Sequence, residues 1–66
     1  AVVKLQDTIY VFEFKVDGTP EEALAQINSK GYAIPYQADH RKIVKVGVNF
    51  DSATRTIGEW KIELGS

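Results

Sequence analysis

The chain has no cysteine and a single histidine among its 66 residues. It therefore has neither a disulfide framework nor a thiolate metal site, and one imidazole does not make a histidine cluster. A core of this size rarely supplies more than about 3–5 kcal/mol of net stability without such cross-links. Stability must come from the packing of one small domain or from a partner.

Long apolar runs and a strong net charge are also missing. No stretch approaches the length of a membrane span, and no charged, hydrophobic leader precedes the first apolar residues, so we expect a soluble, cytoplasmic chain that crosses no membrane. A formal net charge of -1 gives no global attraction to polyanions. The glycine-rich phosphate loop of an ATPase is absent, so ATP binding would belong to another domain.

The most informative segment is residues 9–17, IYVFEFKVD, in which a carboxylate and an ammonium stand two apart inside an apolar run. Aromatic and β-branched residues at this density predict a strand, in which residues two apart share a face. Glu13 and Lys15 therefore project together. The opposite row, which we expect to face the core, holds Tyr10, Phe12, Phe14 and Val16. The charged pair is either part of a chemical site or a surface ion pair on a half-exposed strand.

Local signals around this strand predict a hairpin and a helix. Residues 2–5 and 8–16 form the hairpin, with Gln6 and Asp7 as its loop. Thr19 supplies an N-cap hydroxyl and Pro20 the first helical position, and the helix should end at Gly31 after residue 29 or 30. Its buried stripe is Ala23, Leu24 and Ile27.

The second half of the chain predicts a loop and two more strands. Residues 32–41 have no clear period and form a loop with one helical turn at most, whereas residues 42–50 and 56–64 alternate as strands around a turn at 51–55. We expect Trp60 to be a core residue. The fold class is therefore α+β, a small mixed sheet in strand-strand-helix-strand-strand order packed on one helix, in which the helix links parallel strands by a right-handed crossover.

Residues 7–15, 18–19, 21–24, 26–27, 30–32, 36 and 42–50, taken in this order, resemble a domain of the PD-(D/E)XK nuclease superfamily. The similarity is to the version found at the C-terminus of bacterial AAA-ATPase-like proteins of unknown function. This resemblance implies that residues 1–66 are a single domain, the C-terminal part of a restriction-endonuclease-like core.

The resemblance also implies a metal-dependent phosphodiesterase site that contains Glu13 and Lys15. Mg²⁺ prefers oxygen ligands, and one strand offers the Glu13 carboxylate and the Phe14 main-chain carbonyl side by side. Lys15 would orient the attacking water or offset charge on the phosphoryl oxygens. Gln26 resembles a helix glutamine that some nuclease branches place beside the metal, although it is equally well a flanking polar residue of an amphipathic helix.

Nucleases of this superfamily also use an aspartate from the preceding strand, and this chain departs from that pattern. If the hairpin loop sets Leu5 opposite Thr8, the position opposite Glu13 falls immediately before Ala1. We therefore expect this chain to be a fragment that lacks one metal ligand. Asp7 cannot replace that ligand, because it lies at the wrong end of the hairpin.

Two other groups of residues have alternative interpretations. Tyr32 and Tyr36 either stack on a base or sugar or cover the edge of the core. His40, Arg41 and Lys42 form a short basic cluster that is either a phosphate contact or part of a solvated loop.

The predicted function is a fragment of a Mg²⁺-dependent nuclease domain that acts on nucleic acid in the intact protein and is inactive alone. The alternative is a non-catalytic module for interaction with an attached ATPase-like domain or for self-association. Because a sheet that lacks a neighbour exposes an edge, we expect this chain to form a homo-oligomer, with a twofold dimer as its form.

Overall fold

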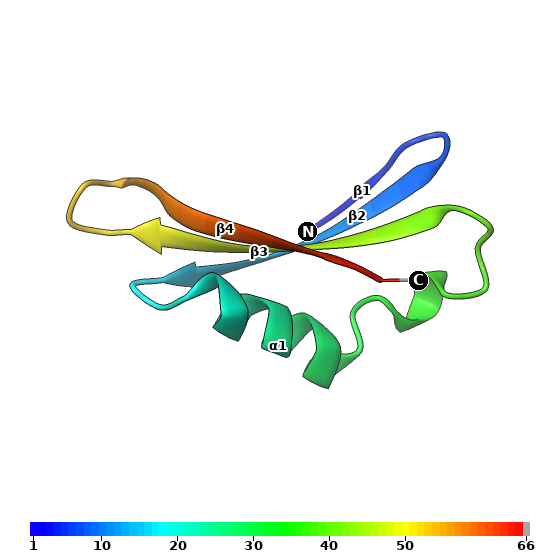
Figure 1. Cartoon of the computed structure of the whole chain (residues 1–66), viewed down its shortest axis with the longest axis horizontal. Coiled ribbons are helices and arrows are strands. Elements are labelled where there is room, and N and C mark those ends of the chain that lie inside the picture. Colours follow the sequence, from blue (N-terminus) through cyan, green and yellow to red (C-terminus); the bar gives the residue numbers. More distant parts are fainter. Residues whose placement is uncertain (66) are drawn as a thin grey trace.

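The computed structural model describes residues 1–65, which form a four-stranded mixed sheet with one helix on one of its faces (Figure 1). The elements in chain order are β1 (Val2–Lys4), β2 (Thr8–Val16), α1 (Pro20–Lys30), the 3₁₀ turn η1 (Ile34–Tyr36), β3 (Lys42–Asp51) and β4 (Thr56–Leu64). The strands lie side by side in the order β1-β2-β3-β4. The α+β fold class and the element order are confirmed.

The hairpin and the crossover set the register of the sheet. The Leu5 N–H donates to the Thr8 carbonyl oxygen at 2.8 Å, so β1 and β2 pair antiparallel with Val2 opposite Val11. Strands β2 and β3 are parallel and joined through α1, whereas β3 and β4 are antiparallel. This is the pairing that the sequence predicts.

Helix α1 begins and ends where its capping residues place it. The Thr19 hydroxyl oxygen accepts from the Glu22 N–H at 3.1 Å, which caps the helix N-terminus, and the same hydroxyl donates to the Glu22 carboxylate at 3.1 Å. At the other end Gly31 has φ 67°, and the Tyr32 N–H donates to the Ile27 carbonyl oxygen at 3.1 Å. This C-terminal motif requires a residue in the left-handed backbone conformation, which glycine adopts without steric cost.

The core lies between α1 and the odd-numbered row of β2. Its buried members are Ile9, Val11, Leu24, Ile27, Ala33 and Ile43, with Tyr36 packed against them. The helix approaches the sheet closely at Gly47, where a Cβ atom would overlap the Pro20 carbonyl oxygen and stand 3.0 Å from Leu24 Cγ. Glycine is required there because any side chain would push α1 away.

The prediction that the even-numbered row of β2 faces the core was wrong. The even-numbered row turns away from α1, and no element covers that face within residues 1–65 (Figure 1). Phe14 is 53% exposed there, and Trp60, expected in the core, is 64% exposed. The physical reason is that one helix covers one face of a sheet, and the crossover places α1 over the row that contains Ile9 and Val11. We call the uncovered side the open face.

Candidate functional site

Glu13 and Lys15 lie on the helix-facing side of β2, in the same row as the buried Ile9 and Val11. Both are half-buried, and their register partners on β3 are Gly47 and Asn49. Within residues 1–65 neither side chain makes a hydrogen bond or an ion pair with another residue. Two oppositely charged side chains thus stand together at the rim of the core without being used to hold the fold together.

The main-chain carbonyl of Phe14 points to the outer edge of β2. The Phe12 N–H donates to the Ala1 carbonyl oxygen at 2.8 Å, and the Ala1 ammonium donates to the Phe12 carbonyl oxygen at 3.0 Å. Because backbone groups two residues apart on a strand point to the same side, the Phe14 carbonyl points to this edge too, beyond the point where β1 begins. The carbonyl and the Glu13 side chain belong to neighbouring residues of the same strand.

A cavity of about 350 Å³ adjoins Glu13 at this edge. Its lining residues are Ala1, Val2, Val11, Phe12, Glu13, Tyr32 and Tyr36. Tyr36 packs against the core, which agrees with the interpretation that it covers the core edge, whereas Tyr32 is 39% exposed. The Lys4 ammonium lies 5.2 Å from the centre of the Tyr36 ring, a cation–π contact that the sequence pattern did not single out.

Gln26 is half-buried on the flank of α1 that faces away from Glu21 and Asn28, the residues that contact β4. This is the flank nearer to β2. The Gln26 side chain makes no hydrogen bond within residues 1–65, so the structure brings it to the side of the helix where Glu13 lies without fixing its orientation.

The residues that the structure describes do not by themselves make a Mg²⁺ site. Within residues 1–65 no group of three His, Cys, Asp or Glu side chains is placed to hold a metal ion. Glu13 contributes one carboxylate and Phe14 one carbonyl, whereas the hairpin register puts Ala1 opposite Phe12, so the position opposite Glu13 would precede Ala1. Asp7 lies at the other end of β2, next to Thr8. These two groups alone are an incomplete donor set for Mg²⁺.

The basic cluster lies far from Glu13. Lys42 pairs with Thr8, five positions from the Glu13–Gly47 pair, which corresponds to about 16 Å along the strand. Arg41 is engaged with the Asp39 carboxylate at 3.3 Å and donates to the Leu5 carbonyl oxygen at 3.3 Å. The Arg41 backbone N–H holds the pKa of Asp39 below its ordinary value. These contacts fit a structural loop, and the cluster is not part of the Glu13 site.

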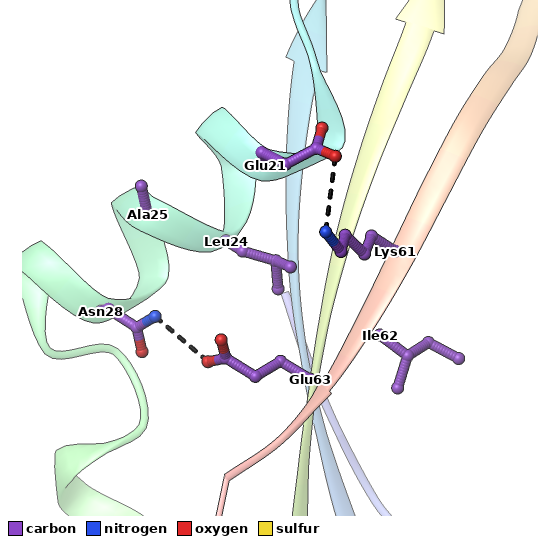
Figure 2. A pocket seen from close by; sticks show the side chains of 7 residues that line it. All are labelled: Glu21, Leu24, Ala25, Asn28, Lys61, Ile62 and Glu63. Carbon is purple, nitrogen blue, oxygen red and sulfur yellow. Dashed lines mark hydrogen bonds and ion pairs between the residues drawn. The ribbon is translucent and has the colours of Figure 1, made fainter.

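A second cavity, of about 420 Å³, lies between α1 and β4 (Figure 2). Its polar side chains contact one another: Lys61 forms an ion pair with Glu21 at 3.5 Å, and the Asn28 amide donates a hydrogen bond to Glu63 at 3.2 Å. The Lys45 ammonium also donates to Asn28 Oδ1 at 2.6 Å. The contacts between Lys61 and Glu21 and between Glu63 and Asn28 hold β4 against the helix. We therefore interpret this cavity as a structural seam between α1 and β4 and not as a candidate site.

No helix within residues 1–65 has the length and apolarity needed to cross a bilayer.

Sequence similarity relates the chain to a known family of proteins. An uncharacterized protein in the vnfD 5′ region of Azotobacter chroococcum mcd 1 is 40% identical over 57 residues, which are 83% of this chain and 11% of that protein. The chain thus spans about a tenth of the length of this relative. No solved structure matches the chain. A family model described as the PD-(D/E)XK nuclease superfamily matches residues 1–60, and the chain therefore belongs to the PD-(D/E)XK nuclease superfamily.

Proposed function

We propose that this chain is the C-terminal part of a Mg²⁺-dependent nuclease domain in a longer, cytoplasmic protein, and that it does not cleave nucleic acid alone. The observation that carries the proposal is the convergence of three groups at one edge of β2. Glu13 and Lys15 share the helix-facing side, and the Phe14 carbonyl points to the uncovered edge beside them. Within residues 1–65 none of the three is used elsewhere in the fold, which is typical of groups kept for a ligand.

Each group suits one task in phosphodiester hydrolysis. Glu13 and the Phe14 carbonyl would hold the metal ion, and Lys15 would stabilise negative charge on the phosphoryl oxygens. Bound Mg²⁺ would supply charge neutralisation and an activated water. Gln26, on the adjoining flank of α1, would position a water or a phosphate oxygen. The Tyr32 ring, on the wall of the cavity beside Glu13, would support a base or sugar.

The second carboxylate of the proposed site would be an aspartate at the strand position opposite Glu13. Directly opposed residues of an antiparallel pair share a face, so a residue immediately before Ala1 would present its side chain beside Glu13. A carboxylate there completes a two-carboxylate site of the kind that Mg²⁺ uses.

The test is cleavage of DNA and RNA by the 66-residue chain and by a longer chain that carries this aspartate, each with Mg²⁺ or Mn²⁺. We expect no useful activity from the short chain. The longer chain should cleave, and Glu13→Gln or Lys15→Ala should abolish cleavage. Glu59→Gln on β4 and Lys42→Ala at the start of β3 are matched controls that should retain it. Metal-dependent cleavage by the short chain, or indifference of the longer chain to Glu13, contradicts the proposal.

The alternative is a non-catalytic module that docks to an attached ATPase-like domain. The specific observation in its favour is the open face, on which the large apolar side chains Phe14, Trp60, Ile62 and Leu64 are exposed. A longer chain that folds, carries the aspartate and binds its attached domain, but cleaves nothing, would support this function instead.

A further inference from the structure

We propose that β4 is a self-pairing edge: two copies of the chain join their β4 strands antiparallel about a twofold axis at Ile62, which creates one continuous eight-stranded sheet. The proposal is independent of the nuclease function, since the Glu13 site lies on β2 and β2 is separated from β4 by β3.

Among residues 1–65 no strand pairs with the outer side of β4. In this part of the chain β4 is the last strand of the sheet, and its one partner is β3. The Gly65 N–H donates to the Ile43 carbonyl oxygen at 2.7 Å, so residues 61 and 63, which have the same parity, also point to β3. By alternation, the backbone groups of Trp60, Ile62 and Leu64 point outward. A row of unpaired donors and acceptors of this kind is a template for another strand.

The bulge in β4 limits where that strand can pair. Asn49 pairs with Glu59 and Phe50 with Ile57, so Gly58 is the extra residue and the regular part of the edge is residues 59–64. A twofold axis at Ile62 keeps the central pairs inside this regular part. An axis at Trp60 would place Gly58, the bulged residue, opposite Ile62 of the second copy.

Charges on the helix-facing side favour an axis at Ile62 over one at Lys61. Glu59, Lys61 and Glu63 alternate there, and Figure 2 shows Lys61 and Glu63 reaching toward α1 while Ile62 points away. An axis at Ile62 sets Lys61 opposite Glu63 of the second copy, twice. An axis at Lys61 would instead oppose Lys61 to itself and Glu59 to Glu63. Opposite charges across a strand pair stabilise it and like charges destabilise it.

The open-face side chains match in this register too. Ile62 lies opposite its own copy, and Trp60 lies opposite Leu64 of the second copy. All three side chains are exposed in the single chain, and aromatic or branched pairs across strands are stabilising. Pairing through β4 also joins the two open faces into one surface on the same side of the sheet.

Cross-linking tests the register, because the chain has no cysteine of its own. In a hydrogen-bonded antiparallel pair the Cα atoms are about 5.5 Å apart, within the span of a disulfide. Ile62→Cys should therefore give a covalent dimer on mild oxidation. Lys61→Cys should give no covalent dimer, because residue 61 would be opposite residue 63 of the second copy. Phe14→Cys on β2 should give none either. A dimer of the Phe14→Cys chain and none of the Ile62→Cys chain would assign self-association to the open face or to β2, and would overturn the proposal.

Charge reversal tests the contact itself by sedimentation at micromolar concentration. Lys61→Glu should raise the dissociation constant of the dimer by roughly tenfold, because both cross-strand pairs become repulsive. Glu63→Lys added to Lys61→Glu should restore dimerisation. Because these substitutions also reverse charges that contact Glu21 and Lys45 in the same chain, circular dichroism and urea unfolding check that each variant remains folded. Glu59→Lys should leave the dimer unchanged. The proposal would be overturned if the unsubstituted 66-residue chain were strictly monomeric. Dissociation of the dimer by Glu59→Lys would overturn the register with its axis at Ile62.

Discussion

Glu13 and Gly47 are register partners in the parallel pair of β2 and β3, and the absent side chain of Gly47 is what lets α1 settle onto the sheet beside Glu13. A Cβ atom at residue 47 would stand 3.1 Å from the Leu24 backbone nitrogen. The height of the helix above the candidate site therefore depends on a residue that is next to Glu13 in space and 34 positions away in the sequence.

Gly47→Ala should destabilise the fold by about 1–3 kcal/mol, because the added methyl group meets the backbone of α1, which cannot move aside as a flexible side chain does. Urea unfolding followed by circular dichroism measures the change. Gly58→Ala is the matched control: its Cβ atom would meet neighbours at 3.7 Å only, an ordinary contact. Equal losses from the two variants would show that close helix packing is not the cause.

Valines on the two faces of β2 should respond differently to truncation. Val11 is 1% exposed beneath α1, whereas Val16 is 66% exposed on the open face. Val11→Ala should cost about 1.5–3 kcal/mol of unfolding free energy, the worth of a fully buried valine. Val16→Ala should stay within about 0.5 kcal/mol, as surface substitutions do. The reverse order in urea unfolding would mean that the open face is the core in solution.

Short-range chemistry made the element boundaries predictable. The Thr19 cap and the left-handed Gly31 fix the ends of α1, and the Gln6-Asp7 loop fixes the β1–β2 register, so the helix, the hairpin and the pairing of β2 with β3 were expected correctly. These features depend on a few neighbouring residues. Local signals of this kind are present in the sequence itself.

Hydrophobicity predicted the wrong buried face of β2, because the even row carries the large apolar side chains, whereas the odd row is apolar only at Ile9 and Val11 and continues with Glu13 and Lys15. Which row is buried depends on where the crossover places α1, and a right-handed crossover is defined only once the strand order is known. For the same reason Trp60 was misplaced: on an edge strand of a sheet with one covered face, an aromatic residue can point to the uncovered side.

The candidate site was predictable in part. The period of two placed Glu13 and Lys15 together, whereas the proximity of Tyr32 to Glu13 arises from the chain reversal at Gly31 and has no sequence period. Lys4 was missed, because its position over the Tyr36 ring depends on the hairpin register and on η1 at once.

The Asp17 carboxylate should give the fold a pH-dependent contact. The Ser52 hydroxyl, and then the Ser52 backbone N–H, donate to it and hold its pKa below the ordinary value of 3.8. A carboxyl group with a lower pKa in the folded state contributes stability above its ordinary pKa and loses it as the pH falls through the lowered value. Ser52→Ala should raise the Asp17 pKa in an NMR titration and reduce stability near neutral pH, with the deficit shrinking in acid. An unchanged titration would contradict this contact.

Asn28 should matter more than an ordinary helix surface residue. Its side chain accepts from the Lys45 ammonium at 2.6 Å and donates to Glu63 at 3.2 Å, and the Lys45 side chain is 14% exposed. Asn28→Ala leaves Lys45 with Glu63 at 3.7 Å as its nearest charge partner and should cost about 1 kcal/mol in urea unfolding. Ser29→Ala, one position along the exposed helix surface, should change stability little. Equal effects would mean that the seam between α1 and β4 contributes nothing.

Tyr32 should act on nucleic-acid binding rather than on folding, provided that the longer, aspartate-bearing chain is a nuclease. Its ring lines the cavity beside Glu13 and is partly exposed, whereas Tyr36 on the same wall packs against the core. Base–aromatic stacking is worth about 1–3 kcal/mol per base, so Tyr32→Ala should weaken binding of single-stranded DNA roughly tenfold or more, and Tyr32→Phe should retain it. Tyr10→Ala, on the open face, is the control and should bind normally. Fluorescence anisotropy with Ca²⁺ in place of Mg²⁺ measures affinity without turnover, and equal binding by all three variants would leave Tyr32 with a purely structural role at the core edge.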